Sequence, residues 1–192
     1  MAMTVTSLFA LGALIFGVHA YRDWLGALES VSWAEHYMNA SLLGVIERSL
    51  STSDWPYTPL AEAPALVRPL WIAAIVFVVI RGLSALERPL PIDRQFLIVT
   101  AAMLLLSPLG WVYYLFLLMA PLAAVLASDA PMLDRRTRTL LLIGVCGLLM
   151  PAPVPWLTLQ WDNGIITTTL GGVYTWGLLI VFLAATRVKS RP

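Results

Sequence analysis

The segment of this chain with the clearest chemical potential is Asn39-Ala-Ser41-Leu-Leu-Gly44-Val-Ile-Glu-Arg48. Asn39 is a favourable N-cap, so residues 40–50 are predicted to form a short helix. On that helix Ser41, Gly44 and Arg48 share one stripe, and the missing side chain of Gly44 would leave a ligand room beside Arg48. A guanidinium is a planar fork of donors that suits a phosphate. The alternative is an interfacial helix whose arginine pairs with an acidic neighbour or with a lipid headgroup.

A second motif, Ser107-Pro108-Leu-Gly110-Trp111-Val-Tyr113-Tyr114, interrupts the apolar run 95–127. As one straight helix this run would reach about 50 Å, against a bilayer core of about 30 Å. Proline and glycine break helices, so the motif predicts a tight turn between two spans. Irregular backbone at membrane depth needs cover by protein or by a wet cavity. Trp111, Tyr113 and Tyr114 either line a sugar-binding cavity on the outer side or mark the interface of an ordinary helical hairpin.

Other candidates for chemistry are weaker. Glu35 and His36 are neighbours that could form an acid–base pair, and Asp162 lies in a polar turn. No Ser-His-Asp set, HExxH motif, phosphate loop or dinucleotide fingerprint is present. A single cysteine, Cys146, excludes a disulfide framework and a cysteine-based zinc site. With two histidines in the chain, we expect no bound metal and no resident cofactor.

Composition sets the class of protein in which these motifs must be placed. The residues are 59% hydrophobic and only 12% charged, whereas a soluble domain carries about 25% charged residues. The net charge of +1 provides no basic surface, so nucleic acid is not an expected partner. We therefore expect an all-α integral membrane protein in contact with membrane lipids.

Six membrane spans are predicted, at about residues 4–20, 69–86, 95–107, 111–127, 139–157 and 164–186. Nine of the twelve basic residues then fall in three loops on one side, which the positive-inside rule makes cytoplasmic together with both termini. A loop at 21–68 with a short interfacial helix lies outside. The basic residues inside are Arg81, Arg88, Arg94, Arg135, Arg136, Arg138, Arg187, Lys189 and Arg191.

Two further features bear on this topology. Seven of the eight tryptophans fall on the predicted outer side, which is the pattern of a lipid or sugar site or of an interface belt. The exception is Trp176. Residues 1–20 have the apolar run of a secretory signal, but the first seven residues lack the basic charge that such a signal carries. Cleaved or retained, this segment leaves the 21–68 loop outside.

The pair of motifs, Asn39-x-Ser41-x-x-Gly44-x-x-x-Arg48 followed by Ser107-Pro108-x-Gly110-Trp111-x-Tyr113-Tyr114, resembles the C-terminal half of glycosyltransferase family 87. These polytopic enzymes of the GT-C class are similar to polyprenyl-phosphate-mannose-dependent mannosyltransferases. The resemblance covers roughly residues 20–130. This chain departs from the family pattern at Gly110, where serine or alanine is usual, and at Tyr113, where histidine is frequent.

The resemblance implies transfer of a hexose, with mannose expected, from a polyprenyl phosphate donor to a lipid or glycan acceptor. The reaction would take place on the extracytoplasmic face of a bacterial cytoplasmic membrane. It also implies a longer enzyme whose catalytic carboxylate precedes this chain, so residues 1–192 would be one membrane domain of a fragment. Glu35 is the best local candidate for a general base. The expected binding residues for the donor phosphate and sugar are Arg48, Arg68, Asn39, Ser41, Gly44, Ser107, Trp111, Tyr113 and Tyr114.

Two other functions stay open. One is a non-catalytic membrane subunit or lipid-binding protein built on the same scaffold. The other is a transporter or channel, which is disfavoured because spans two to six carry essentially no ionisable residue beyond their ends.

Overall fold

The computed structural model describes residues 2–30, 33–52, 55–127, 134–158 and 160–187. Helices connected by turns make up these residues, and their only β-type pairing is an isolated bridge between Asn39 and Trp111. The expectation of an all-α protein is therefore confirmed. The chain divides into two compact units, residues 1–33 and 34–192, which are described separately.

The first unit is helix α1 (Ala2–Ser30), which bends at Gly17. Gly17 has φ of 78° and ψ of 156°, a conformation that residues with a side chain rarely adopt. The predicted span 4–20 lies within this helix. The helix continues to Ser30, so residues 21–30 of the segment that was assigned to the outer loop are helical. Nothing in residues 21–30 stops a helix, since neither proline nor a C-capping motif occurs there.

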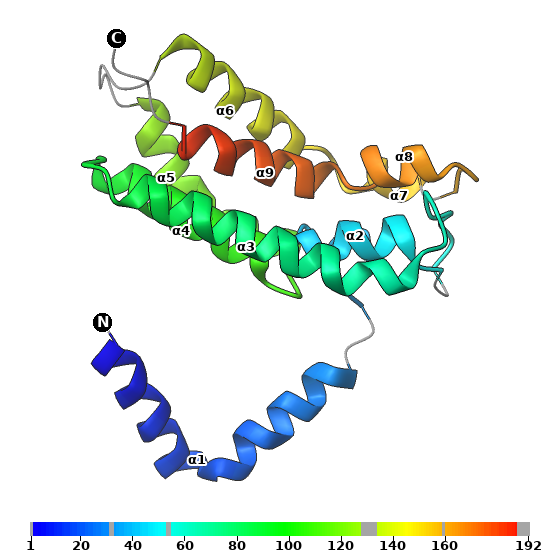
Figure 1. Ribbon diagram of the computed structural model, residues 1–192. Helices are drawn as coiled ribbons and strands as arrows, with labels where there is room; N and C mark the ends of the chain where they lie inside the picture. The colour runs from blue at the N-terminus through cyan, green and yellow to red at the C-terminus, as the bar shows by residue number, and fades with distance from the viewer. Residues whose placement is uncertain (1, 31–32, 53–54, 128–133, 159, 188–192) are drawn as a thin grey trace. The chain divides into compact units, whose positions relative to one another are not determined.

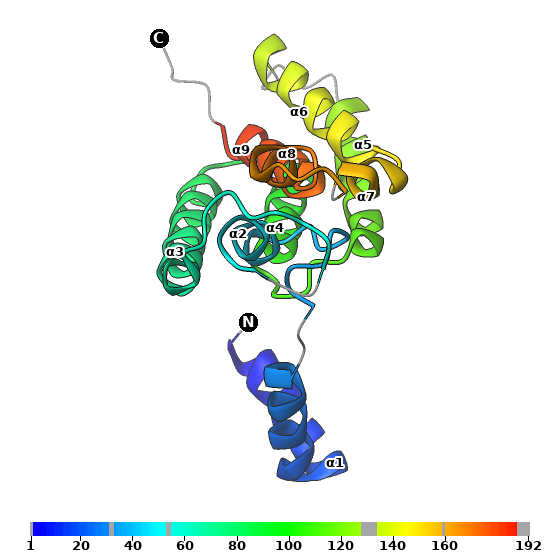
Figure 2. The same cartoon turned by 90° about the vertical axis from the view of Figure 1, so that its right-hand side faces the viewer.

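The second unit holds the other helices, long ones side by side and short ones gathered at one end (Figure 1). The long helices are α3 (Val67–Leu86), α4 (Ile92–Leu106), α5 (Phe116–Ala127), α6 (Arg135–Leu148) and α9 (Val173–Ala185). The short ones are α2 (Leu42–Leu50), η1 (Pro64–Leu66), η2 (Val112–Leu115), α7 (Pro153–Thr158) and α8 (Gly164–Thr169). Figure 2 looks onto the end that carries the short helices, where α2 packs against α3, α4 and α8.

The predicted break in the 95–127 run is confirmed. Helix α4 ends at Leu106, and Ser107 is extended with φ of −61° and ψ of 130°. A residue before proline avoids the helical conformation, which is the local cause of the break. After the turn, η2 leads directly into α5, which packs against α4 as a hairpin.

The last two predicted spans are shorter than expected. The helix in 139–157 ends at Leu148, and a separate turn of helix, α7, follows a proline-rich stretch. The span at 164–186 is divided between α8 and α9. The division falls at Gly171 and Gly172, where an added Cβ would lie 2.4 Å and 2.5 Å from carbonyl oxygens of the preceding turn. Hydropathy alone cannot reveal these breaks, because apolar residues continue through them.

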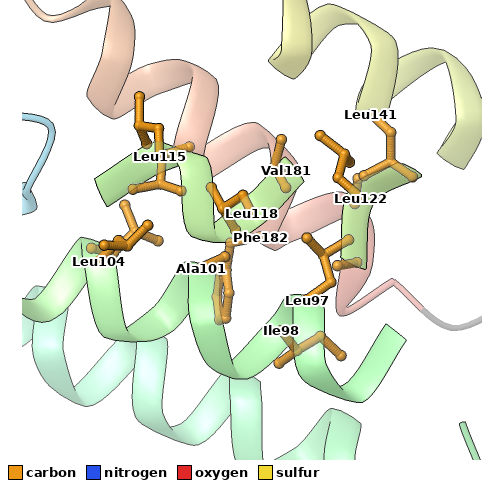
Figure 3. Close-up of a cluster of buried hydrophobic side chains, with 14 of the residues drawn as sticks. Leu97, Ile98, Ala101, Leu104, Leu115, Leu118, Leu122, Leu141, Val181 and Phe182 are labelled. Atoms are coloured by element: carbon orange, nitrogen blue, oxygen red, sulfur yellow. The ribbon is translucent and has the colours of Figure 1, made fainter. Parts of the chain in front are cut away.

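Close helix contact holds α6 on α9. A Cβ added at Gly144 would lie 2.9 Å from the Gly177 carbonyl oxygen, and the reciprocal distance is also 2.9 Å. Below this contact lies a core drawn from α4, α5 and α9, in which Leu97, Leu118 and Phe182 are fully or almost fully buried (Figure 3). Small residues at the contact and large ones around it allow the helix backbones to approach each other.

One helical stretch among the described residues, Pro64–Leu86, is long and apolar enough to cross a membrane. Val112–Ala127 and Val173–Ala185 are shorter apolar helices. The α3 helix leaves large apolar side chains exposed, including Phe77 at 51% and Ile80 at 60%.

Two arginines join the ends of α3 and α4 to the end of α9. Arg94 donates from Nε to the Ala185 carbonyl oxygen at 2.8 Å and from Nη2 to that of Arg187. Arg81 donates to the Thr186 hydroxyl at 3.2 Å. The start of α6 lies at this same end of the second unit (Figure 1). The three basic segments, which join α3 to α4, begin α6 and follow α9, therefore lie at the end opposite α2, α7 and α8.

Candidate functional site

The α2 helix is capped by Ser41 and not by Asn39. The Ser41 hydroxyl accepts a hydrogen bond from the Gly44 N–H at 3.0 Å, and the helix begins at Leu42. The short helix that was predicted from residue 40 is thus present, but its N-cap was assigned two residues too early. Asn39 is unavailable as a cap because its side chain is used elsewhere.

The buried Asn39 side chain joins the two sequence motifs. Its Nδ2 donates to the carbonyl oxygens of Ala34 at 2.8 Å and Pro108 at 2.9 Å. Its Oδ1 accepts from the backbone N–H groups of Ser41 and Gly110, both at 3.0 Å. These four bonds use the full donor and acceptor capacity of the amide. Asn39 has 0% exposure, so each of its bonds replaces a lost contact with water.

Backbone pairing reinforces this junction. The Ala40 N–H donates to the Gly110 carbonyl oxygen at 2.7 Å, and the Val112 N–H donates to that of Met38 at 2.9 Å. A Cβ added at Gly110 would lie 2.6 Å from the Leu104 carbonyl oxygen and 3.1 Å from the Ser41 nitrogen. Glycine at this position is therefore required by the close approach of the two segments.

Gly44 serves the same packing. A Cβ at this position would lie 2.8 Å from the Ala34 carbonyl oxygen and 3.0 Å from the Asn39 side chain. The expectation that Gly44 leaves space for a ligand is wrong, because the 34–39 segment already occupies that space. Because Gly44 has no side chain, the loop at residues 34–39 packs directly against the first turn of α2.

Arg48 is fully buried and directed toward the same loop. Its Nη1 donates to the carbonyl oxygens of His36 at 2.8 Å and Glu35 at 3.4 Å, and both terminal nitrogens donate to that of Asn39 at 3.3 Å. Burial lowers the pKa of Arg48 to about 10, while attraction to Tyr57 and Glu35 opposes the shift. The guanidinium therefore stays charged at neutral pH. A phosphate could reach it only by displacing these carbonyl groups.

The remaining predicted residues lie around this junction at different depths. Ser107 and Trp111 are half-buried in the turn, whereas Tyr113 is 62% and Tyr114 is 49% exposed on η2. Arg68 is exposed in the first turn of α3, outside the hydrogen-bond network. The Asp162 carboxylate accepts a hydrogen bond from the Thr58 hydroxyl at 2.5 Å, which links two outer loops. The structure thus unites Asn39, Ser41, Gly44 and Arg48 with the turn and leaves Arg68 apart.

An aromatic cluster that was not predicted from the sequence lies beside the junction. The His36 ring contacts Trp55 edge-on at 4.6 Å, Tyr37 at 4.6 Å and Trp111 at 5.2 Å between centroids. Tyr37 extends the cluster to Trp156 on α7 at 5.4 Å. The excess of tryptophan on one side was the available signal. Within the second unit, the Trp176 indole N–H also reaches α8, donating to the Thr168 carbonyl oxygen at 2.7 Å.

The proton position on His36 follows from a backbone contact. The Met38 N–H donates to Nδ1 at 3.1 Å, so the neutral ring carries its hydrogen on Nε2. Burial and then the nearby Arg48 charge lower the pKa of His36 below its ordinary value. At neutral pH the ring is therefore uncharged and offers a donor at Nε2.

An apolar pocket of about 160 Å³ opens between α5 and α6. One of its lining residues is Val112, which pairs with Met38 in the junction. The lining is apolar throughout and consists of Val112, Leu115, Phe116, Leu118, Met119, Leu122, Val145, Leu148 and Leu149. Such a pocket suits a hydrocarbon chain.

Within the described residues, no group of three or more His, Cys, Asp or Glu side chains could hold a metal ion. Comparison of the chain with protein-family models, with curated proteins and with solved structures finds no match.

Proposed function

We propose that this chain is the donor-binding part of a multi-span membrane glycosyltransferase that uses a polyprenyl phosphate sugar. The single observation that carries the proposal is the junction at Asn39, whose side chain bonds to both motifs on which the family resemblance rests. Residues about 70 positions apart in sequence thereby meet beside the half-buried rings of His36 and Trp111, and Val112 of the same junction lines the apolar pocket. Mannose is the proposed sugar, as the resemblance implies.

The distribution of charge supports a membrane placement with this site outside. Arg81, Arg94 and the start of α6 lie at one end of the second unit, and the aromatic cluster lies at the other. The positive-inside rule assigns the basic end to the cytoplasm of a bacterium. The exposed apolar side chains of α3 suit contact with lipid. We propose six spans, of which the last two are interrupted near the outer face.

The donor would be held at both of its ends. The apolar pocket between α5 and α6 is proposed to take isoprenoid carbons, and one of its lining residues, Val112, belongs to the junction. Arg48 is the proposed cation for the phosphate once the loop carbonyls that it now contacts move away, with Arg68 as the second candidate. In the reaction the acceptor hydroxyl attacks the anomeric carbon. The bond from that carbon to the phosphate oxygen breaks, and the lipid phosphate leaves with the electron pair. A base takes the hydroxyl proton, for which Glu35 is the local candidate.

A second candidate function is a non-catalytic subunit or lipid-binding protein on the same scaffold. The engagement of Arg48 by the carbonyl groups of residues 35, 36 and 39 favours it, because those contacts must break before an anion binds. Both functions share the isoprenoid ligand, and they differ in whether sugar transfer follows binding.

The test uses the chain in lipid nanodiscs with undecaprenyl phosphate and with its mannosyl derivative. The Val145→Phe substitution fills the pocket and should weaken binding of both ligands about tenfold, or about 1.4 kcal/mol. Ile143→Phe adds the same ring to an exposed face of α6, 51% accessible, and should leave binding unchanged. Binding no tighter than that of phosphatidylglycerol would refute the proposal. Binding of the mannosyl lipid without transfer to any added acceptor would favour the subunit.

A further inference from the structure

We propose that the aromatic cluster of His36, Tyr37, Trp55, Trp111 and Trp156 is a binding site for a pyranose ring, in which ring faces stack on the sugar and the His36 Nε2–H donates to one of its hydroxyl groups. This inference rests on the proposed function for the biological identity of the sugar. Its physical basis is the arrangement of the five rings.

The cluster brings together four segments that are remote in sequence: the loop at residues 36–37, the loop at 55, the turn at 111 and helix α7 at 156. None of these rings is fully buried, and Trp156 is 38% exposed. The cluster is therefore accessible from solvent, above all at Trp156. Open ring faces beside polar groups are the surface on which the C–H faces of sugars bind.

The polar part of the site is defined by His36. Its Nδ1 accepts the Met38 N–H, which leaves Nε2 as a fixed donor. No hydrogen bond within the described chain engages Nε2, so it is available to a ligand. Because Nδ1 is occupied and Nε2 carries the hydrogen, the neutral ring has no free lone pair to act as a base. His36 is therefore a binding donor in this proposal, and it takes no part in proton transfer.

Charge separates a sugar from the other common ligand of aromatic clusters. Rings of this kind also bind quaternary ammonium groups. Here the Arg48 guanidinium donates to the His36 carbonyl oxygen at 2.8 Å, so a fixed positive charge lies behind the cluster. That positive charge repels a cationic ligand, does not repel a neutral pyranose, and attracts a pyranose that carries a phosphate. The cluster also includes Trp111, the chain neighbour of Val112, which lines the apolar pocket.

The experiment is saturation-transfer difference NMR on the chain in nanodiscs, with methyl α-mannoside and methyl α-glucoside as probes and without sugar-based detergent. We expect transfer to the ring protons of at least one glycoside. Trp156→Leu should reduce it at least threefold, whereas Trp161→Leu, a control at an outer tryptophan with 55% exposure and no ring contact to the cluster, should leave it unchanged.

Two histidine variants test the donor. Asn at position 36 can still accept the Met38 N–H from near the Nδ1 position, but it has no group where Nε2 lies. His36→Asn should therefore lose binding while the fold is kept, and His36→Gln, which restores a donor near Nε2, should recover part of it. Absence of transfer from both glycosides, or equal loss in the Trp156 and Trp161 variants, would overturn the inference. Since these probes have no isoprenoid chain, this result is independent of the lipid-binding test above.

Discussion

Replacement of Asn39 by alanine should be among the most destabilising single changes in the second unit. The side chain makes four hydrogen bonds, to Ala34, Ser41, Pro108 and Gly110, and it has 0% exposure. A buried neutral hydrogen bond contributes about 1 kcal/mol net, so removal of all four should lower the free energy of unfolding by about 4 kcal/mol. The backbone groups that Asn39 now pairs would stay buried without a partner, which would lower the free energy of unfolding further.

Asn163→Ala is the matched control for this substitution. Asn163 caps α8 by accepting from the N–H groups of Ile165 and Ile166, but it is exposed. Loss of an exposed N-cap costs about 1 kcal/mol. Asn39→Asp is a second variant that keeps the volume. Its ionised carboxylate would face the carbonyl oxygens of Ala34 and Pro108, so it should be as harmful as alanine although no cavity forms.

The assay is reversible unfolding of the chain in mild detergent, followed by tryptophan fluorescence against urea or SDS fraction. The expected order of stability is wild type, then the Asn163 variant, then both Asn39 variants, with a gap of about 3 kcal/mol between the two positions. Equal losses at the two positions would refute the reasoning, because the four bonds of Asn39 would then contribute no more than one exposed cap. A stable Asn39→Asp protein would show that the amide donors are dispensable.

Three further outcomes follow from the same structure. Gly110→Ala should cost roughly 1–3 kcal/mol in the same unfolding assay because its Cβ meets backbone, while Gly26→Ala, with nothing within 4 Å, should cost nothing. The free energy of unfolding should fall as the pH drops below about 6.5, because the pKa of His36 is lower in the folded chain, so the unfolded chain binds a proton that the folded chain does not. His36→Asn should flatten this dependence on pH. An unchanged slope in the variant would contradict the role given to His36. In a cysteine-free background, Gln160→Cys should react with an impermeant maleimide in intact cells, whereas Arg138→Cys should react only after lysis. The reverse pattern would overturn the proposed membrane orientation.

Local signals identified several elements correctly. Proline after Ser107 and the glycine that follows predict the break between α4 and η2, and the uninterrupted apolar run after Arg68 predicts α3. Both depend on backbone conformation and hydropathy within a few residues, which are properties that sequence expresses directly. The interruption between α8 and α9 was not predicted, although Gly171 and Gly172 form a glycine pair of the kind that marks turns, because hydropathy stays high on both sides of the pair.

The residues of the candidate site were named from the sequence, but the contacts between them were not predicted. The two motifs were considered together because as a pair they resemble one enzyme family, and the structure joins them through Asn39. The roles within them differ from expectation, because Asn39 bonds across the fold while Ser41 caps the helix. Arg48 was expected to face a ligand, yet in the folded chain it is directed at loop carbonyls. No property of residues 39–48 alone distinguishes an arginine that faces inward from one that faces outward.

The sequence by itself determined the helical class, the break at Ser107–Pro108 and the separation of basic from aromatic segments, since each follows from local conformational preference or from simple counts. Tertiary structure alone decided which donors meet which acceptors. Asn39 reaches Pro108 and Gly110 only because two turns approach closely enough to exclude a Cβ, and the five aromatic rings meet only because four segments converge. These contacts depend on the positions of entire helices, which no single segment of sequence specifies.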